Sequence, residues 1–326
     1  ILYFFYWQSV VALITTIVLA VYLWRSLPKS NGRSKFDKNL FIKNWKFVSG
    51  VMGISLGTVL LSQIDKIILS KMLTLEIFSY YMLATTVATV IMSLVSPIHT
   101  ALFPRLSQLV VKKDETGISD LYHRGCQLAS IIILPISITM IFFSKEILST
   151  WIGDPTVVNN THILLSLLIV GTTIKAYMTL PYTLQLAHGW TKLAFYKNVI
   201  AVIIIIPSML WAAQMYQGMG AAWVLIILYL GLLIFEIIIM HRRILKGNMR
   251  KRYGYDVFIP VLIASIIGFA AHEIHDLFSV DVSEVITALA ILCTLVCSFM
   301  ASAWSTGNLN TRVMSLLKIK ERKKIV

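Results

Sequence analysis

Long apolar runs alternate with short polar segments along most of this chain, and the lengths of the runs predict its elements. Crossing the hydrocarbon core of a bilayer takes about 20 residues of α-helix. We therefore predict membrane-spanning helices over residues 1–24, 47–70, 76–97, 120–143, 162–186, 194–213, 218–240, 257–272 and 285–303. The pattern predicts an all-α polytopic membrane protein with about nine transmembrane helices.

Composition agrees with this fold class. Hydrophobic residues make up 57% of the 326 positions, charged residues make up 13%, and mean hydropathy is +0.79. The net charge of +14 follows from topology, since all but four of the 29 Lys and Arg residues fall on segments that share one predicted side of the membrane. Basic residues concentrate in cytoplasmic loops of membrane proteins. The charge pattern thus places residues 25–46 and the C-terminus in the cytoplasm, and we expect no nucleic-acid partner.

Two inward connections are longer than the others. Residues 25–46 combine Pro, Gly and many Lys, which is typical of a flexible linker. In the second, residues 98–119, Leu102, Leu106 and Leu109 recur at helical spacing. A short amphipathic helix lying in the membrane interface and a solvated loop are both compatible with this pattern.

The span 47–70 is unusually rich in small and polar residues. Gly50, Gly53 and Gly57 recur at helical spacing, and several polar residues precede Asp65. One interpretation is a helix that lines a hydrated cavity, and the other is close packing through small residues. Both can hold on different faces. Ionisable groups at bilayer depth are candidates for a pathway or a binding site, so Gln63, Asp65 and Lys66 become site candidates.

Hydroxyl residues form a stripe on the span 76–97. Thr89, Ser93 and Ser96 lie three to four residues apart and therefore on one side of the helix. A single hydroxyl often bonds back to its own helix, but a stripe favours a polar interior. We include Thr89 and Ser93 among the site candidates.

Lys175 lies near the middle of the span 162–186, too deep to reach the membrane surface easily. A central Lys costs about 2.5–3.5 kcal/mol on insertion scales, which some other interaction must offset. Thr172, Thr179 and Tyr182 share its helix face. Contact with an anionic ligand, a structural ion pair and a misplaced span boundary are the three explanations. Glu236, by contrast, is expected to reach the aqueous surface from the end of its span.

The chain shows no constellation that predicts catalysis. Its His residues are scattered over loops and span ends, and its three Cys residues fall inside predicted spans without metal-ligand spacing. We therefore expect no catalytic residue, no bound metal and no cofactor. The candidates of the site are polar residues of the spans: Lys175, Asp65, Gln63, Lys66, Thr172, Thr179, Tyr182, Thr89 and Ser93.

A family resemblance rests on two segments. The first runs Gln63-Ile-Asp65-Lys66-Ile-Ile-Leu-Ser-Lys71-Met-Leu and continues at Glu76-Ile-Phe-Ser-Tyr80-Tyr81, and the second is Phe103-Pro104-Arg105-Leu106-Ser107 after Pro97. Together they resemble lipid-linked oligosaccharide flippases of the multidrug/oligosaccharidyl-lipid/polysaccharide exporter superfamily. In that family, two six-helix lobes enclose a central cavity.

The resemblance implies a division of the chain into parts. These are the last helix of an N-terminal lobe (1–24), a cytoplasmic inter-lobe linker (25–46), a six-helix C-terminal lobe (47–240), a basic cytoplasmic loop (241–256), two additional spans (257–303) and a basic cytoplasmic tail (304–326). The chain begins with Ile1 inside an apolar run, so we expect an N-terminal truncation that removes the five earlier helices of the first lobe.

The resemblance also implies a function. It predicts a flippase in the bacterial inner membrane that moves an undecaprenyl-pyrophosphate-linked oligosaccharide repeat unit for O-antigen or exopolysaccharide synthesis, without enzymatic activity. Its partners would be that lipid-linked substrate and membrane lipids, with a polysaccharide polymerase and a chain-length regulator as candidate protein partners. A drug/cation antiporter of the same fold is the first alternative, and a membrane-embedded polymerase or ligase is the second.

Overall fold

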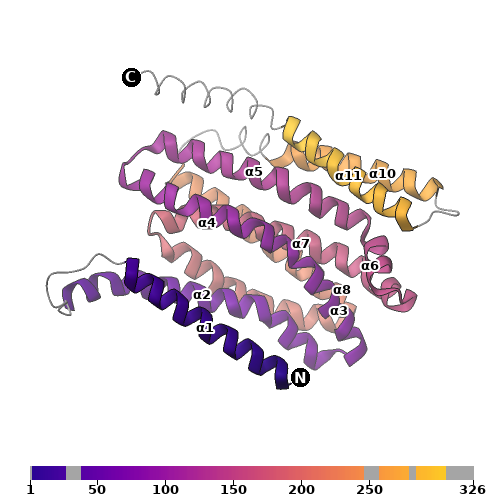
Figure 1. Ribbon diagram of the computed structural model, residues 1–326, viewed down its shortest axis with the longest axis horizontal. Helices are drawn as coiled ribbons and strands as arrows, with labels where there is room; N and C mark the ends of the chain where they lie inside the picture. The colour runs from indigo at the N-terminus through magenta and orange to yellow at the C-terminus, as the bar shows by residue number, and fades with distance from the viewer. Residues whose placement is uncertain (1, 27–37, 246–256, 279–283, 306–326) are drawn as a thin grey trace. The chain divides into compact units, whose positions relative to one another are not determined.

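The computed structural model describes residues 2–26, 38–245, 257–278 and 284–305, and their regular structure is helical (Figure 1). This confirms the predicted all-α class. The helices are α1 (Leu2–Ser26), α2 (Lys38–Met72), α3 (Leu75–Ala88), α4 (Val90–Val111), α5 (Glu115–Phe142), α6 (Ser144–Ile152), α7 (Pro155–Ala187), α8 (Thr191–Arg243), α10 (Ile259–Phe278) and α11 (Glu284–Ser305).

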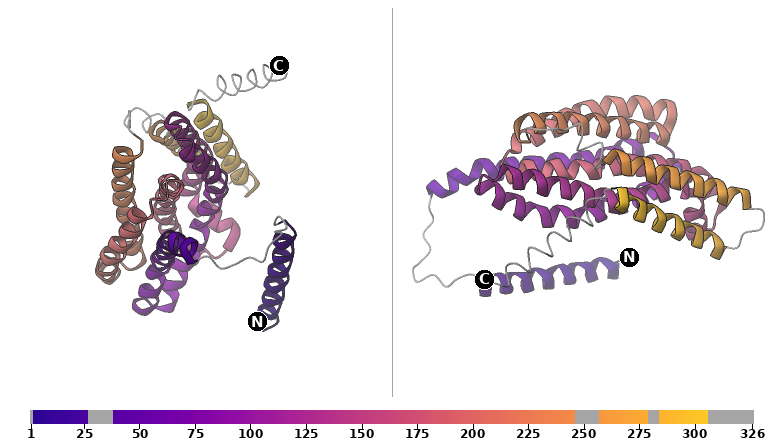
Figure 2. Two further views of the ribbon diagram at one scale, coloured as in Figure 1. Left: turned by 90° about the vertical axis from the view of Figure 1, so that its left-hand side faces the viewer. Right: turned by 90° about the horizontal axis from the view of Figure 1, so that it is seen from above.

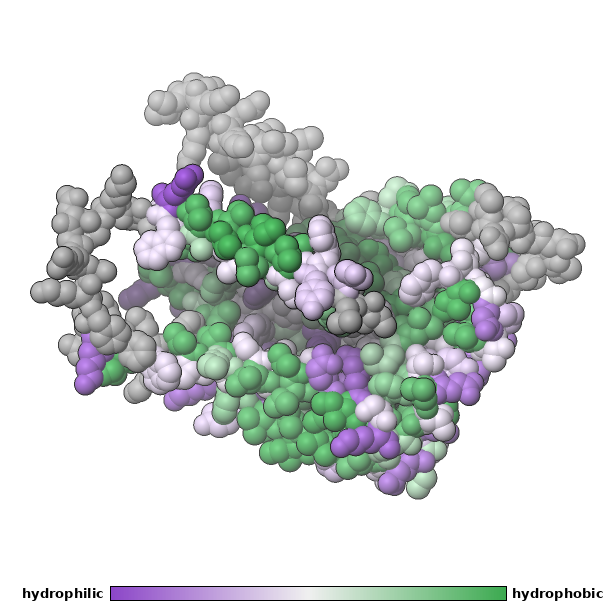
Figure 3. Space-filling model, turned by 60° about the horizontal axis from the view of Figure 1, so that its bottom comes forward, coloured by the Kyte–Doolittle hydropathy of each residue, from purple (hydrophilic) through white to green (hydrophobic). Residues whose placement is uncertain are grey.

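The protein is a membrane protein by the length and apolarity of its helices. Within the described residues, 6 helical stretches are long and apolar enough to span a bilayer: Phe5–Ser26, Val48–Met72, Leu75–Val111, Glu115–Phe142, Pro155–Ala187 and Thr191–Arg243. Shorter apolar helices cover Ile259–His275 and Leu289–Ala303. Hydrophobic side chains accordingly cover much of the visible surface (Figure 3).

The longest helix contains two of the predicted spans. Within α8, Gln217 adopts φ 51° and ψ −134°, which breaks the helix between the predicted spans 194–213 and 218–240. Positive φ is uncommon for a residue other than Gly and marks a turn. The two halves of α8 therefore act as separate helices. Together with the two shorter apolar helices, this explains why the predicted number of spans exceeds the number of long stretches.

The chain divides into two compact units, Ile1–Lys46 and Phe47–Val326. The first unit holds α1, whose apolar side chains are exposed and whose last turn carries Arg25. A basic residue in a last turn interacts favourably with the helix dipole. The described part of α2 begins at Lys38, inside the segment expected to be a linker, and the rest of that segment that precedes it, residues 27–37, lies outside the described residues.

Helix α7 occupies the centre of the second unit. It contacts α3, α4, α5, α6 and α8, and α4, α5 and α7 lie side by side (Figures 1 and 2). Helices α10 and α11 pack on each other and on α5. Two hydrophobic clusters meet along α7, one including Leu165 and Ile169 and the other including Leu180 and Leu184. The apolar packing of α7 therefore fixes the position of the polar residues on the side of this helix that neither cluster covers.

The glycines of α2 pack against α8. A Cβ added at Gly50 would lie 2.7 Å from the Thr191 hydroxyl oxygen, and one added at Gly57 would lie 3.0 Å from the Asn198 Cβ. At Gly53 the ring of Phe195 is 3.0 Å from the added atom. Small residues let membrane helices approach closely. The packing interpretation of this stripe is therefore correct.

A polar contact fixes the register of the same two helices. The Asn198 side-chain amide donates to the Ile54 carbonyl at 3.1 Å and to the Thr58 hydroxyl at 3.1 Å. Asn198 is buried, so these bonds satisfy an amide that lipid could not solvate. Close approach of the glycines thus brings α2 within hydrogen-bonding reach of α8.

Residues 98–111 form neither a loop nor a separate interfacial helix, and that prediction was wrong. Helix α4 continues to Val111 through two prolines, with Leu106 fully buried and Leu102 packed beside Gly125 of α5. The apolar stripe therefore faces protein rather than the membrane interface, because α5 folds back along α4. Its helical spacing indicated the helix but not its partner.

The turn between α4 and α5 is closed by a side-chain cap. Asp114 accepts a hydrogen bond from the Gly117 backbone N–H at 2.9 Å and one from the Thr116 hydroxyl at 2.9 Å. These bonds, the backbone one first, lower the pKa of the exposed Asp114 carboxyl. A charged N-cap of this kind stabilises the start of α5.

The glycine contact generates a stability prediction. Gly57→Leu should overpack the α2–α8 interface and cost about 1–3 kcal/mol, because the backbone of α2 has to move away from Asn198. The measurement is thermal unfolding of the detergent-solubilised protein. Gly231→Leu is the matched control, since nothing lies within 4 Å of a Cβ there. Equal melting temperatures for the two variants would contradict close packing at Gly57.

Candidate functional site

Most of the predicted site residues gather around a polar cavity of about 200 Å³ enclosed by α2, α3, α4, α7 and α8. Lys175 and Thr172 reach it from α7, and Asp65 reaches it from α2. Further predicted residues in its wall are Gln63, Lys66 and Thr89. The cavity interpretation of α2 therefore also holds, on the polar side of the same helix that carries the glycines.

A larger cavity of about 470 Å³ adjoins the first. Thr179 and Tyr182 line it together with Lys175, as do three residues that the sequence pattern did not indicate: His99, Lys197 and Asn198. The two cavities share Leu61, Met92, Lys175 and Tyr229, so Lys175 stands at their junction. Ser93 lines neither of them and lies exposed on α4.

Lys175 presents a charge without a countercharge in contact. Its Nζ lies 5.5 Å from the centroid of the Tyr229 ring, within the range of a cation–π interaction. No hydrogen bond or ion pair of this ammonium group occurs among the described residues. One aromatic face offsets only part of the cost of a deep Lys. Of the three explanations for Lys175, contact with an anionic ligand fits this environment better than a structural ion pair.

Asp65 is buried within the first cavity, with 5% of its surface exposed. Its Oδ2 accepts a hydrogen bond of 2.6 Å from the Tyr81 hydroxyl, whereas its Oδ1 has no partner among the described residues. Asp65 lies inside α2, which ends at Met72, so it does not cap that helix. A buried carboxylate oxygen without a donor can accept a hydrogen bond from a ligand in the cavity.

Lys66 points back along its own helix. Its Nζ donates to the Ser62 carbonyl at 3.1 Å and to Gln63 Oε1 at 3.4 Å. These local bonds hold the charge in the wall of the first cavity. The side-chain oxygen of Gln63 thereby accepts a hydrogen bond from Lys66, and the two residues form one polar patch.

A rigid aromatic wall borders the larger cavity. His99 Nδ1 lies 2.6 Å from the Thr183 hydroxyl, which ties α4 to α7. The His99 ring stacks on Tyr182 with centroids 6.2 Å apart and on Phe103 at 6.3 Å. Stacked rings of this kind present fixed faces and edges to a ligand.

A buried ion pair was missed in the sequence. Glu236 is completely buried and its Oε2 lies 2.7 Å from Lys197 Nζ, while its Oε1 accepts a 2.6 Å bond from the Gln185 amide. Glu236 therefore does not reach the aqueous surface, and that expectation was wrong. The charge pattern places Lys197, at the start of the predicted span 194–213, only among the basic residues of the cytoplasmic side, but it is buried. The sequence did contain a signal for this pair, namely the short break between the predicted spans 194–213 and 218–240. A turn at Gln217 makes these spans antiparallel, and Lys197 precedes Gln217 by about as many residues as Glu236 follows it.

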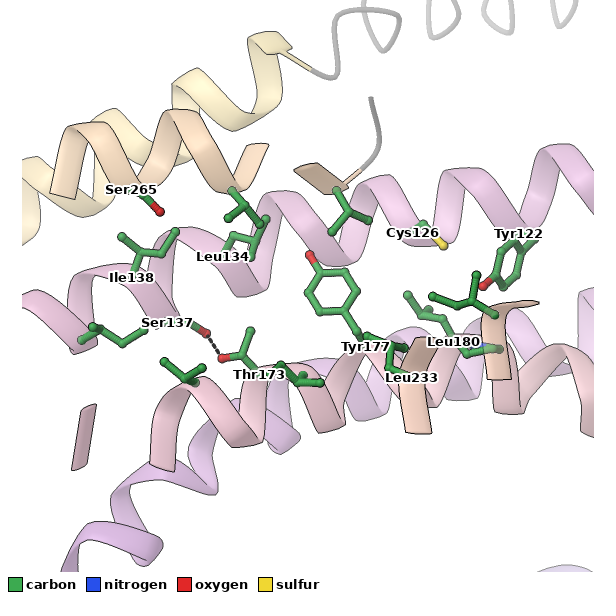
Figure 4. A pocket seen from close by; sticks show the side chains of 17 residues that line it. Tyr122, Cys126, Leu134, Ser137, Ile138, Thr173, Tyr177, Leu180, Leu233 and Ser265 are labelled. Carbon is green, nitrogen blue, oxygen red and sulfur yellow. Dashed lines mark hydrogen bonds between the residues drawn. The ribbon is translucent and has the colours of Figure 1, made fainter. Parts of the chain in front are cut away.

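A third cavity has a different character. It measures about 360 Å³, lies among α5, α7, α8 and α10, and has an almost entirely apolar wall (Figure 4). Hydroxyls of its wall are engaged within the protein: the Thr173 hydroxyl donates to Ser137 and the Tyr177 hydroxyl donates to Ser130, each at 2.8 Å. This cavity offers little to a polar ligand. Among the described residues no group of three His, Cys, Asp or Glu side chains could hold a metal ion.

Comparison with known proteins agrees with the resemblance seen in the sequence. Residues 2–157 match the family described as "Polysaccharide biosynthesis protein". A protein of Shigella flexneri described as "Putative O-antigen transporter" is 22% identical over 215 residues, which cover 65% of this chain and 49% of that protein. The chain thus spans about half the length of this curated relative. No solved structure matches it.

These findings confirm the relationship inferred from the two sequence segments. The chain is a membrane protein that resembles the polysaccharide biosynthesis family over residues 2–157 and is distantly related to that O-antigen transporter.

Proposed function

We propose that the protein is part of a flippase that moves an undecaprenyl-pyrophosphate-linked oligosaccharide repeat unit across the bacterial inner membrane, for O-antigen or exopolysaccharide synthesis. The observation that carries this proposal is Lys175, a charged side chain that has no ionic partner among the described residues and lies at the junction of two cavities lined in part by polar side chains. The distant relationship to an O-antigen transporter supports it.

The physical task of such a protein is to move a polar headgroup through a layer that cannot solvate it. Sugar hydroxyls and a pyrophosphate lose their water in hydrocarbon at a prohibitive cost. A polar cavity replaces that water with fixed donors and a positive charge, while the prenyl chain stays in lipid. Asp65, Thr172 and Tyr182 supply hydrogen-bonding groups beside the Lys175 ammonium. The task breaks no covalent bond, so we infer that the protein is not an enzyme.

The proposed architecture assigns the helices to two lobes. Helix α1 would be the last helix of the first lobe, and α2 to α8 would form the six spans of the second, with the two halves of α8 counted separately. Helices α10 and α11 would be the two additional spans. In alternating access, the second lobe would rock against the first.

A drug/cation antiporter remains the second candidate, favoured by one observation. The free Oδ1 of Asp65 is a buried acidic oxygen that a cation could approach. The same cavity wall contains Lys66 and Lys175, however, so its formal charge is positive. An anionic substrate therefore fits this cavity better than a cationic one.

The proposed topology can be tested with reporter fusions. Fusions after Lys38 and after Lys324 should report the cytoplasm, and one near Asp154 should report the periplasm, because basic segments stay on the cytoplasmic side. Activity of alkaline phosphatase and fluorescence of a green fluorescent protein tag are the measurements. Opposite signals at any two of the three sites would reverse or refute the topology.

Loss of the Lys175 charge should impair transport. In the full-length protein, Lys175→Met should lower surface polysaccharide about 10- to 100-fold, as expected when one charge-assisted hydrogen bond to the substrate is lost. Lys175→Arg should retain more activity because it keeps a charge that can meet a phosphate.

The measurement is polysaccharide on the surface of cells that lack their own flippase, at protein levels matched by immunoblot. Lys192→Met is the control, since Lys192 is an exposed Lys on α8. Parental polysaccharide in the Lys175→Met strain would argue against substrate contact.

The charge of Asp65 can be separated from its hydrogen bond. Asp65→Asn removes the negative charge but keeps an oxygen that accepts a hydrogen bond from the Tyr81 hydroxyl. Tyr81→Phe removes this donor and keeps the charge of Asp65. If Asp65 orients substrate or gates the cavity through its charge, Asp65→Asn should lower export several-fold and Tyr81→Phe should lower it less. If only Tyr81→Phe impairs export, Asp65 serves to join α2 and α3.

A further inference from the structure

The buried ion pair of α8 lies at the edge of the larger cavity. Lys197 lines that cavity, with 7% of its surface exposed, whereas Glu236 lies behind it with no exposed surface. The ammonium group therefore stands between a fixed carboxylate and the space that a ligand would occupy. Lys175 lines the same cavity from α7.

Both carboxylate oxygens of Glu236 have a partner, but the polar network around this residue is not fully satisfied. Its two oxygens contact Lys197 and Gln185, but Gln185 Oε1 is itself buried without a hydrogen-bond partner among the described residues. Breaking a buried pair by removing one partner is costly, so Lys197 can leave Glu236 only for a ligand that offers a comparable negative charge. An anion in the cavity could therefore compete with Glu236 for Lys197, whereas a neutral ligand could not.

We propose that Lys197 is a second anion-binding residue of the larger cavity, and that Glu236 is its competitor when the cavity is empty. The ligand class is a diphosphate, with one phosphoryl group at Lys175 and the other at Lys197. This inference rests on the proposed function and extends it, because it assigns the second phosphate to a residue on a different helix.

The Lys197–Glu236 pair also couples ligand binding to the packing of the helices. Lys197 and Glu236 belong to the two halves of α8, and Gln185 belongs to α7, so the contact joins three helical segments. When the ammonium group turns toward a diphosphate, the tie between the halves of α8 is loosened. Occupancy of the cavity is thereby coupled to the packing of these helices.

The test measures binding of inorganic pyrophosphate to the purified full-length protein in detergent, by isothermal titration calorimetry. Glu236→Gln removes the competitor while keeping an oxygen for the Gln185 amide, and it should tighten pyrophosphate binding about tenfold. Lys197→Met should weaken binding by a similar factor. Lys192→Met, on the exposed side of the same helix, should leave binding unchanged.

An exchange of the two charges separates ligand binding from a structural role. The double variant Lys197→Glu with Glu236→Lys keeps an ion pair in the protein but presents a carboxylate to the cavity. It should melt close to the parent temperature and lose pyrophosphate binding. A stable exchanged variant that binds pyrophosphate as the parent does would show that the pair is structural only, and would overturn the inference.

The outcome is distinguishable from failure of the proposed function. Lys175→Met tests the anion contact that the proposed function requires and leaves the Lys197–Glu236 pair in place, since Lys175 makes no contact with Glu236. Weaker binding in Lys175→Met with no change in Glu236→Gln or Lys197→Met would reject the second site and keep the first. Unchanged binding in Lys175→Met would instead reject the diphosphate site at Lys175 on which the proposal depends.

Discussion

The structure depends on how each charge in the helical bundle is compensated where lipid and packed side chains exclude water. Lys197 and Glu236 neutralise each other at 2.7 Å. Asp65 is compensated halfway, since Tyr81 donates to one carboxylate oxygen and no described residue donates to the other. Lys175 contacts the face of Tyr229 and has no ionic partner in the part of the chain that the structure describes. This order, from complete to incomplete compensation, marks where a ligand has most to contribute, because the least satisfied charge gains most from a partner.

Two features of the fold bring these charges together. Helix α7 is surrounded by five other helices, so Lys175 cannot turn toward lipid without displacing packed side chains. The turn at Gln217 makes the halves of α8 antiparallel neighbours, which places Lys197 beside Glu236. The glycines of α2 then let that helix approach α8 closely enough to enclose the space between them. The cavities are therefore a consequence of backbone geometry as much as of polar side chains.

Hydrophobic length predicted the helices well, because a bilayer imposes a minimum span that appears directly in the sequence. Hydrophobic length also identified Lys175 and Asp65 as site candidates, since a charged residue inside a predicted span stands out from its apolar neighbours. It failed for Lys197, which lies near the start of a run and looks like a loop residue. It failed for Leu106 as well, whose spacing revealed a helix but not that α5 covers it. Pairing between helices depends on tertiary contacts that single-helix patterns do not contain.

The balance of charge around the two cavities bears on how a flippase could both bind and release its substrate. Lys66, Lys175 and Lys197 line the cavities, while Asp65 and Glu236 lie within or directly behind the walls. A wall carrying only cations would hold a diphosphate too tightly to let it go, just as a channel must bind its ion weakly enough for it to leave. Carboxylates that compete for the same lysines offset part of that attraction. For the proposed function, Glu236 therefore favours release, and a lysine with an alternative partner suits transport better than an isolated one.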